Sequence, residues 1–83
     1  MTEKVYGKFT QAGPVCEVKP SAEEGPRMMR QMSFLPDGLK NESTVLVDRN
    51  EAAGIVLDLR MWVEVRKSGE VWFVESFGYE LKL

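Results

Sequence analysis

We expect the chain to be a mainly β protein, a small antiparallel barrel or a curled meander sheet with at most one short helix. Three observations predict this fold class. Apolar and polar residues alternate along 55–66, the alternation returns along 71–83, and the turn signal Lys67-Ser68-Gly69 separates the two segments. Successive side chains of a strand point to opposite faces, so each segment is typical of a strand with one buried face. Together they predict a long C-terminal hairpin.

Shorter strands are predicted before this hairpin. Gly and Pro residues break the pattern at 12–14, and a segment rich in Pro and Gly, 19–26, is the longest predicted loop. Residues 50–54 connect the last of the early strands to the hairpin. Alternating apolar residues, bounded by these breaks, favour strands over 4–10, 15–19 and 44–48.

Residues 27–35 fit two structures. As a helix, the segment would start at Pro26, end at Pro36 and carry one apolar stripe. As a strand, it would place three apolar side chains on one face, interrupted by Arg30. Periodicity does not decide a segment this short, so both structures stay open. The stripe of the helix would comprise Met28, Met29, Met32 and Leu35.

The turn predicts a pairing for the hairpin. A three-residue loop, 67–69, pairs Arg66 with Glu70 and gives Gly69 the left-handed conformation that such loops require. A two-residue Ser68-Gly69 loop would set apolar against mixed faces unless a bulge compensates. The three-residue loop pairs Val65 with Val71, Val63 with Phe73, Leu59 with Phe77 and Leu57 with Tyr79.

Glu75 would then lie opposite Met61, in the middle of the apolar face. A buried, unpaired carboxylate costs several kcal/mol or takes up a proton, so Glu75 could belong to a pocket or contact a partner. The favoured interpretation is a bulge near 75–76 that turns the side chain outward, or an ion pair. The candidate arginines for that pair are Arg27, Arg30 and Arg49.

Composition excludes several functions. The chain has 83 residues, enough for one domain spanning 1–83, and a net charge of −2, which argues against duplex binding. It has no histidine and one cysteine, Cys16, so neither the usual zinc site nor a Ser-His or Cys-His pair can form. We therefore expect no enzyme, metal or cofactor. No segment approaches a transmembrane helix and no signal peptide is evident, so we expect a cytoplasmic protein without a membrane partner.

The polar face of the hairpin carries the candidate binding site. In the predicted pairing Trp62 lies opposite Val74, and Trp72 lies diagonally beside them, opposite Glu64. Two indoles on a nominally wet face expose more apolar area than solvent favours. Residues 27–35 or the first strand could cover them, giving a second layer. Otherwise they form a binding patch, for which we expect Arg60, Trp62, Glu64, Arg66, Trp72 and Val74 to be the partner-binding residues.

The layout would suit a small barrel of SH3-like or OB-like size, which by itself gives no function. We expect a non-enzymatic protein-binding module, an accessory subunit or small inhibitor that occupies a surface of a larger protein. An exposed strand edge could also pair with a partner's sheet or form a homodimer. The alternative is a small β-barrel that binds single-stranded nucleic acid. Bases would stack on Trp62, Trp72 and Tyr6, with Lys4, Lys8, Arg60 and Arg66 near phosphates.

Overall fold

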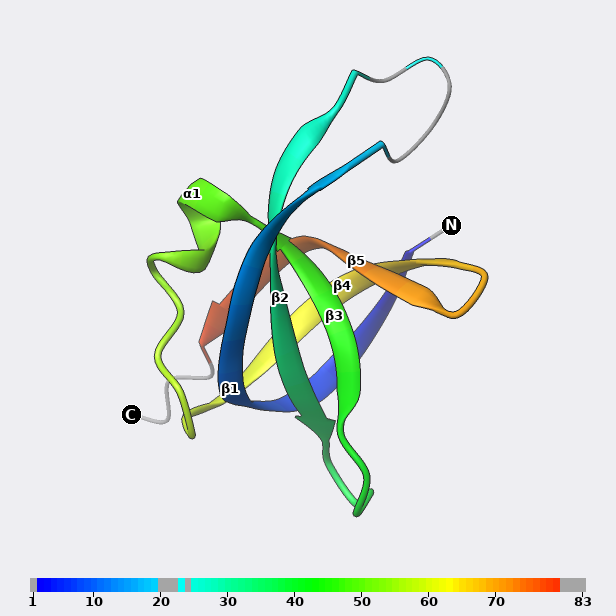
Figure 1. The fold of residues 1–83 in the computed structure, drawn as a ribbon. Coiled ribbons are helices and arrows are strands. Elements are labelled where there is room, and N and C mark those ends of the chain that lie inside the picture. Colours follow the sequence, from blue (N-terminus) through cyan, green and yellow to red (C-terminus); the bar gives the residue numbers. More distant parts are fainter. Residues whose placement is uncertain (1, 20–22, 24, 80–83) are drawn as a thin grey trace.

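The computed structural model describes residues 2–19, 23 and 25–79, and this part of the chain is mainly β structure, as predicted. It contains five strands and one four-residue helix (Figure 1). In chain order they are β1 (Thr2–Val18), β2 (Arg27–Pro36), β3 (Ser43–Asp48), α1 (Arg49–Ala52), β4 (Arg60–Ser68) and β5 (Val71–Tyr79).

The strands close into a barrel in the order β1-β2-β3-β5-β4, with β4 pairing back to β1 (Figure 1). Four of the five pairings are antiparallel. The exception is the short parallel contact of β3 with β5, where Val45 and Leu46 pair with Trp72 and Phe73. Of the two forms predicted from the sequence, the structure has the small barrel.

The barrel interior is filled by the inward side of every strand. The Phe9 and Phe34 rings meet edge to face with their centroids 5.0 Å apart, and both side chains are fully buried. Offset aromatic pairs of this kind stabilise a core beyond the area that they bury. The other buried members are Met32, Val45, Val47, Ala52, Met61, Val63, Val65 and Val74.

β1 is one long strand, whereas the sequence predicted separate strands over 4–10 and 15–19. Its pairing with β2 shifts register between Phe9 and Gln11 and again between Ala12 and Val15. The second irregularity contains Gly13-Pro14, so these residues form a bulge rather than a turn. β1 curves strongly, so that its first half pairs with β4 and its second half with β2 (Figure 1).

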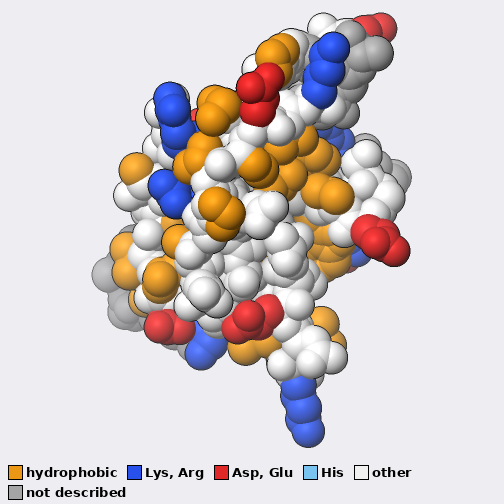
Figure 2. Space-filling model, viewed as in Figure 1, with side chains coloured by type: hydrophobic (Ala, Val, Ile, Leu, Met, Phe, Trp, Pro, Cys, Tyr) orange, Lys and Arg blue, Asp and Glu red, His pale blue; other side chains and the backbone are white. Residues whose placement is uncertain are grey.

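Residues 27–36 are a strand, which settles the choice left open by the sequence. β2 pairs with β1 on one side and β3 on the other, and these long-range pairings outweigh local helix propensity. The end of β1 and the start of β2, up to the pair of Val18 with Arg27, project from the barrel as an arm (Figure 1). Figure 2 shows hydrophobic side chains gathered near the base of this arm. Met29, Leu46 and Phe73 form a second buried cluster, against which Cys16 and Val18 pack.

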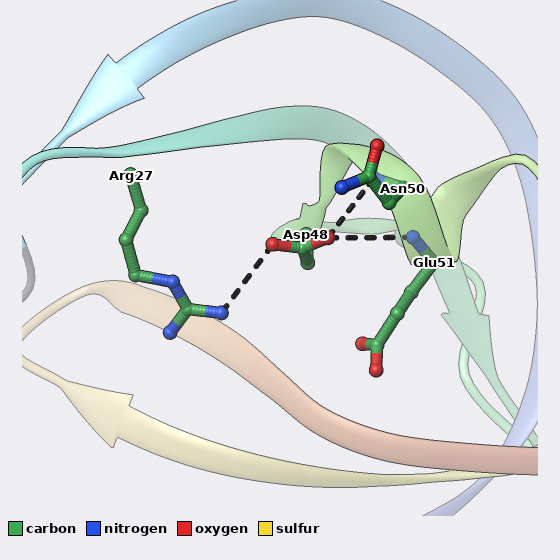
Figure 3. Close-up of polar contacts among 4 residues, drawn as sticks. All are labelled: Arg27, Asp48, Asn50 and Glu51. Carbon is green, nitrogen blue, oxygen red and sulfur yellow. Dashed lines mark hydrogen bonds and ion pairs between the residues drawn. The ribbon is translucent and has the colours of Figure 1, made fainter.

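The short helix lies in the predicted connector instead of at 27–35. Asp48 caps it: one carboxylate oxygen, Oδ1, accepts hydrogen bonds from the backbone N–H groups of Asn50 and Glu51, at 2.9 and 3.4 Å (Figure 3). The other oxygen lies 3.6 Å from an Arg27 guanidinium nitrogen, which ties the helix to β2. In the described part of the chain no helix has the length or apolar character to cross a membrane.

The strand predicted from residue 55 begins at Arg60. Asp58 adopts φ 63°, which breaks an extended chain, and its N–H donates to the Phe9 carbonyl at 2.7 Å. The Tyr79 hydroxyl fixes the same loop, donating to the Gly54 carbonyl at 2.6 Å and accepting from the Val56 N–H at 2.9 Å. The predicted pairs of Leu57 and Leu59 are therefore wrong, and both side chains are exposed.

The predicted hairpin register is also wrong. Ser68 pairs with Val71, so the turn is the two-residue Gly69-Glu70, with Gly69 left-handed as expected, at φ 65°. Val65 consequently pairs with Val74, and a register shift follows immediately. Beyond this shift, the partner of Val63 is Phe77 instead of the predicted Phe73.

The shift is a bulge at Glu75, the position where the alternation failed. Glu75 is exposed, and its carboxylate lies 3.3 Å from Nε of Arg66. The favoured interpretation, an outward-turning bulge, is confirmed. The ion-pair partner differs from the three arginines considered, because Arg66 is the nearest cation once the register moves.

Candidate functional site

The structure separates the six residues predicted to form the binding patch. Arg60, Trp62, Glu64 and Arg66 alternate along β4 and lie on the outside of the barrel, as expected. The other two do not join them. Val74 is 5% exposed in the core, and Trp72 is half-buried and packs against that core beside Val45.

The causes are the two-residue turn and the bulge at Glu75. Trp62 lies opposite Gly78 instead of Val74, and Trp72 lies opposite Lys67 instead of Glu64. The turn shifts the pairing of residues 71–74 by three positions, which turns Trp72 and Val74 inward. The bulge adds one more position, which keeps Phe77 on the inner side opposite Val63. The two indoles therefore point to different sides of the barrel wall, and the patch as predicted is not assembled.

A different cluster forms on the outer surface where β1 meets β4. Tyr6 pairs with Trp62 in the antiparallel ladder, and Lys8 pairs with Arg60. Lys4 lies two residues before Tyr6 on the same face. We call this surface, made of Lys4, Tyr6, Lys8, Arg60 and Trp62, the aromatic–cation face.

Each ring of this face lies close to a cation. The Lys4 ammonium is 4.5 Å from the Trp62 ring centroid and 5.8 Å from that of Tyr6. The Arg60 guanidinium carbon is 5.2 Å from the Tyr6 centroid. Such cations are attracted by the negative face of the ring. Tyr6 is 39% exposed and Trp62 is half-buried, so both rings border solvent.

Gly78 on β5 determines where the Trp62 indole lies. A Cβ at position 78 would lie 2.6 Å from Cζ2 of that ring and 2.9 Å from Nε1. The indole thus lies across the backbone of Gly78, in space that any side chain would occupy. The ammonium of the exposed Lys4 side chain lies 4.5 Å from the ring centroid, and this long side chain can move away from the ring.

Asp37 holds the Arg60 end of the face. Nε and Nη2 of Arg60 both donate to Oδ2 of Asp37, at 3.0 and 2.6 Å. Beside this pair lies a cavity of about 280 Å³ that Lys8 also lines. Its apolar walls are Leu35, Pro36 and Leu39.

The hairpin end of β4 is more nearly neutral. Glu64 accepts a hydrogen bond from the Ser76 hydroxyl at 3.3 Å, Arg66 pairs with Glu75, and Lys67 pairs with Glu3 at 3.0 Å. On the outer face, Lys4 and Lys8 have no ion pair with a described carboxylate, whereas Arg60 pairs with Asp37; all three lie where the aromatic rings are. A second aromatic–cation pair at the hairpin joins Lys67 to Trp72, with 4.5 Å between ammonium and ring centroid.

The sequence analysis named all five residues of the aromatic–cation face but did not predict that they come together. Tyr6, Lys4 and Lys8 were assigned to the nucleic-acid alternative, together with Trp62 and Arg60. Gly78 and Asp37 were missed, because their role depends on pairings between distant segments. The available signal for Gly78 was its position between two aromatic residues near the end of a predicted strand, because a glycine there indicates that another group approaches the backbone closely.

Among residues 2–19, 23 and 25–79, no three Cys, Asp or Glu side chains come together in a way that could hold a metal ion. The aromatic–cation face offers two rings, three cations and an adjoining cavity. No protein-family model, curated protein or solved structure matches the chain.

Proposed function

We propose that the chain binds single-stranded nucleic acid on the aromatic–cation face. The observation that carries this proposal is the pairing of Tyr6 with Trp62 on neighbouring strands, with Lys4 and Arg60 against their rings. Unpaired bases stack on aromatic side chains, and nearby cations track the phosphate backbone. One surface here supplies both.

The strand would lie across β1 and β4, with one base on each ring. Lys4 leaves the Trp62 ring as a base stacks there, and its ammonium then lies near a phosphate. Lys8 and Arg60 supply the other phosphate contacts. A net charge of −2 argues against duplex binding, which needs many such contacts, but three local cations and two stacked bases suffice for a short single strand.

Stacking on Trp62 can be measured by its fluorescence. In Trp72→Phe the remaining tryptophan is Trp62, and a short oligothymidylate should quench its emission, because a stacked base replaces solvent beside the ring. Trp62→Phe is the matched control, since its remaining indole, Trp72, lies on the other side of the barrel wall. If the oligothymidylate quenched only the emission of Trp72 in the Trp62→Phe control, the proposed site would be wrong. If the oligonucleotide bound but quenched neither indole, bases would not stack on Trp62.

Affinity should follow the same ring. Stacking contributes about 1–3 kcal/mol per base, so Trp62→Ala should weaken binding by roughly 5- to 150-fold, and Trp62→Phe by less. With three phosphate contacts, the logarithm of the binding constant should fall with the logarithm of salt concentration with a slope of about −2. An affinity that Trp62→Ala leaves unchanged would exclude this face.

A protein contact is the second candidate, as a module that occupies a larger protein. Trp, Tyr and Arg dominate the binding energy of protein interfaces, and Trp62, Tyr6 and Arg60 share this face. We rank it second because Trp72 and Val74, which were to complete the apolar patch, pack against the barrel core. Binding dominated by apolar contact would change little with salt, which distinguishes the two functions.

A further inference from the structure

We propose that the cavity beside Asp37 takes one guanine base of the bound strand, an inference that rests on the proposed function. The cavity has a volume of about 280 Å³, slightly below the usual range for pockets that hold drug-sized ligands. A cavity of this volume has room for a single base. Its side-chain lining comprises Lys8, Leu35, Pro36, Asp37, Leu39 and Arg60.

The cavity continues the aromatic–cation face. Arg60 lines it, and the guanidinium carbon of the same residue lies 5.2 Å from the Tyr6 ring centroid. The Asp37 N–H donates to the Tyr6 carbonyl at 2.9 Å, so the backbone that forms the cavity wall is bonded to the strand that carries the ring. A nucleotide next to one stacked on Tyr6 therefore reaches the cavity.

The polar groups of the cavity select for one base. Arg60 donates twice to Oδ2 of Asp37, whereas no described group donates to Oδ1. An ionised carboxylate only accepts hydrogen bonds. Guanine presents the N1–H and the 2-amino group side by side on its Watson–Crick edge, an edge that an unpaired base exposes. Thymine has one N–H between two carbonyl oxygens, which the carboxylate would repel.

Lys8 complements the carboxylate. Its side chain lines the cavity and makes no ion pair with any described carboxylate. Lys and Arg are the usual donors to O6 and N7 of guanine, so with a guanine in the cavity Lys8 donates to the base in place of a phosphate. A cavity with a carboxylate acceptor, an ammonium donor and the apolar walls Leu35 and Leu39 is thus complementary to guanine.

The test compares three oligonucleotides on the full chain: oligothymidylate, the same strand with one central deoxyguanosine, and the same strand with deoxyinosine, which lacks the 2-amino group. The guanosine strand should bind roughly tenfold more tightly than oligothymidylate, as expected of one good base contact, with the inosine strand between them. Equal affinities for all three would overturn the guanine pocket and leave stacking intact. No binding of any strand would overturn both proposals.

Asp37→Asn tests the residue itself. Loss of its charge should tighten binding of all strands somewhat, so the readout is the ratio of guanosine to thymidine affinity, which should fall close to one. The matched control is Asp58→Asn, which removes the same charge from an exposed position outside the cavity and keeps a side chain that tolerates φ 63°. If Asp37→Asn kept the preference for the guanosine strand, or if Asp58→Asn lost it equally, Asp37 would not be the residue that recognises guanine.

Discussion

Replacing Gly78 by alanine should displace the Trp62 indole. The added Cβ would lie 2.6, 2.7 and 2.9 Å from three atoms of that ring, whereas carbon atoms pack favourably at about 3.5 Å or more. The ring must therefore move outward by about 1 Å. Inserting a methyl group into a packed site costs about 1–3 kcal/mol, and alanine recovers about 0.5–1 kcal/mol of the backbone entropy that glycine loses. The free energy of unfolding should fall by about 1 kcal/mol.

The functional effect should exceed this loss of stability. A shifted indole can no longer lie flat between the backbone and a stacked base, so affinity for oligothymidylate should fall towards that of Trp62→Ala. In the Trp72→Phe background, the Trp62 emission should move to longer wavelength as the ring becomes more exposed. Urea denaturation measures the stability, and a fluorescence titration measures the affinity.

Gly25→Ala is the control, because a Cβ at Gly25 would meet no atom within 4 Å. It should leave the stability, the emission and the affinity of the protein unchanged. If Gly78→Ala also left the Trp62 emission and the affinity unchanged, the indole would not depend on the space above Gly78, and this account of the site would be wrong.

Three further predictions concern the scaffold. Gly7→Ala should lower the free energy of unfolding by about 3 kcal/mol or more in urea denaturation, because its Cβ would collide with the carbonyl oxygen of Leu35, which belongs to the backbone and cannot move aside; a loss below about 1 kcal/mol would contradict this. Tyr79→Phe should lower the free energy of unfolding by about 1–2 kcal/mol and speed hydrogen exchange of the Val56 amide, which donates to the Tyr79 hydroxyl. Unchanged exchange at Val56 would show that this hydroxyl does not fix the loop. Glu75→Gln should change stability by less than about 0.5 kcal/mol and leave oligonucleotide affinity unaltered, because its ion pair with Arg66 is partly exposed; a large loss would mean that the carboxylate has another role.

Strand content was predictable because alternation is a local property. Met61, Val63 and Val65 follow one another at a spacing of two, and all three are fully buried on the inner side of β4. The same reasoning located β3 and the turn glycine Gly69. It also marked Glu75 as the point where the alternation fails, which is where the bulge lies.

Loop conformation limited the prediction at both ends of β4. Residues 55–59 alternate like the strand that follows them, yet Asp58 adopts a left-handed conformation and its N–H donates to the Phe9 carbonyl. At the other end, the two-residue turn 69–70 replaced the expected loop 67–69 and shifted the hairpin pairings by three residues or more. Neither choice is visible in local periodicity, because each is stabilised by contacts with another strand.

The sequence by itself determined that the chain forms strands, that it has no histidine-based chemistry, and which aromatic and basic residues a binding face could use. Only the tertiary structure decided that Trp62 joins Tyr6 while Trp72 packs against the core. The physical reason is that alternation along a strand specifies which of its own residues share a face. Which other strand lies beside that face depends on pairing between distant segments. The position of the hairpin turn sets which side of β5 Trp72 faces, the bulge at Glu75 shifts the residues that follow it, and ring closure brings β1 beside β4.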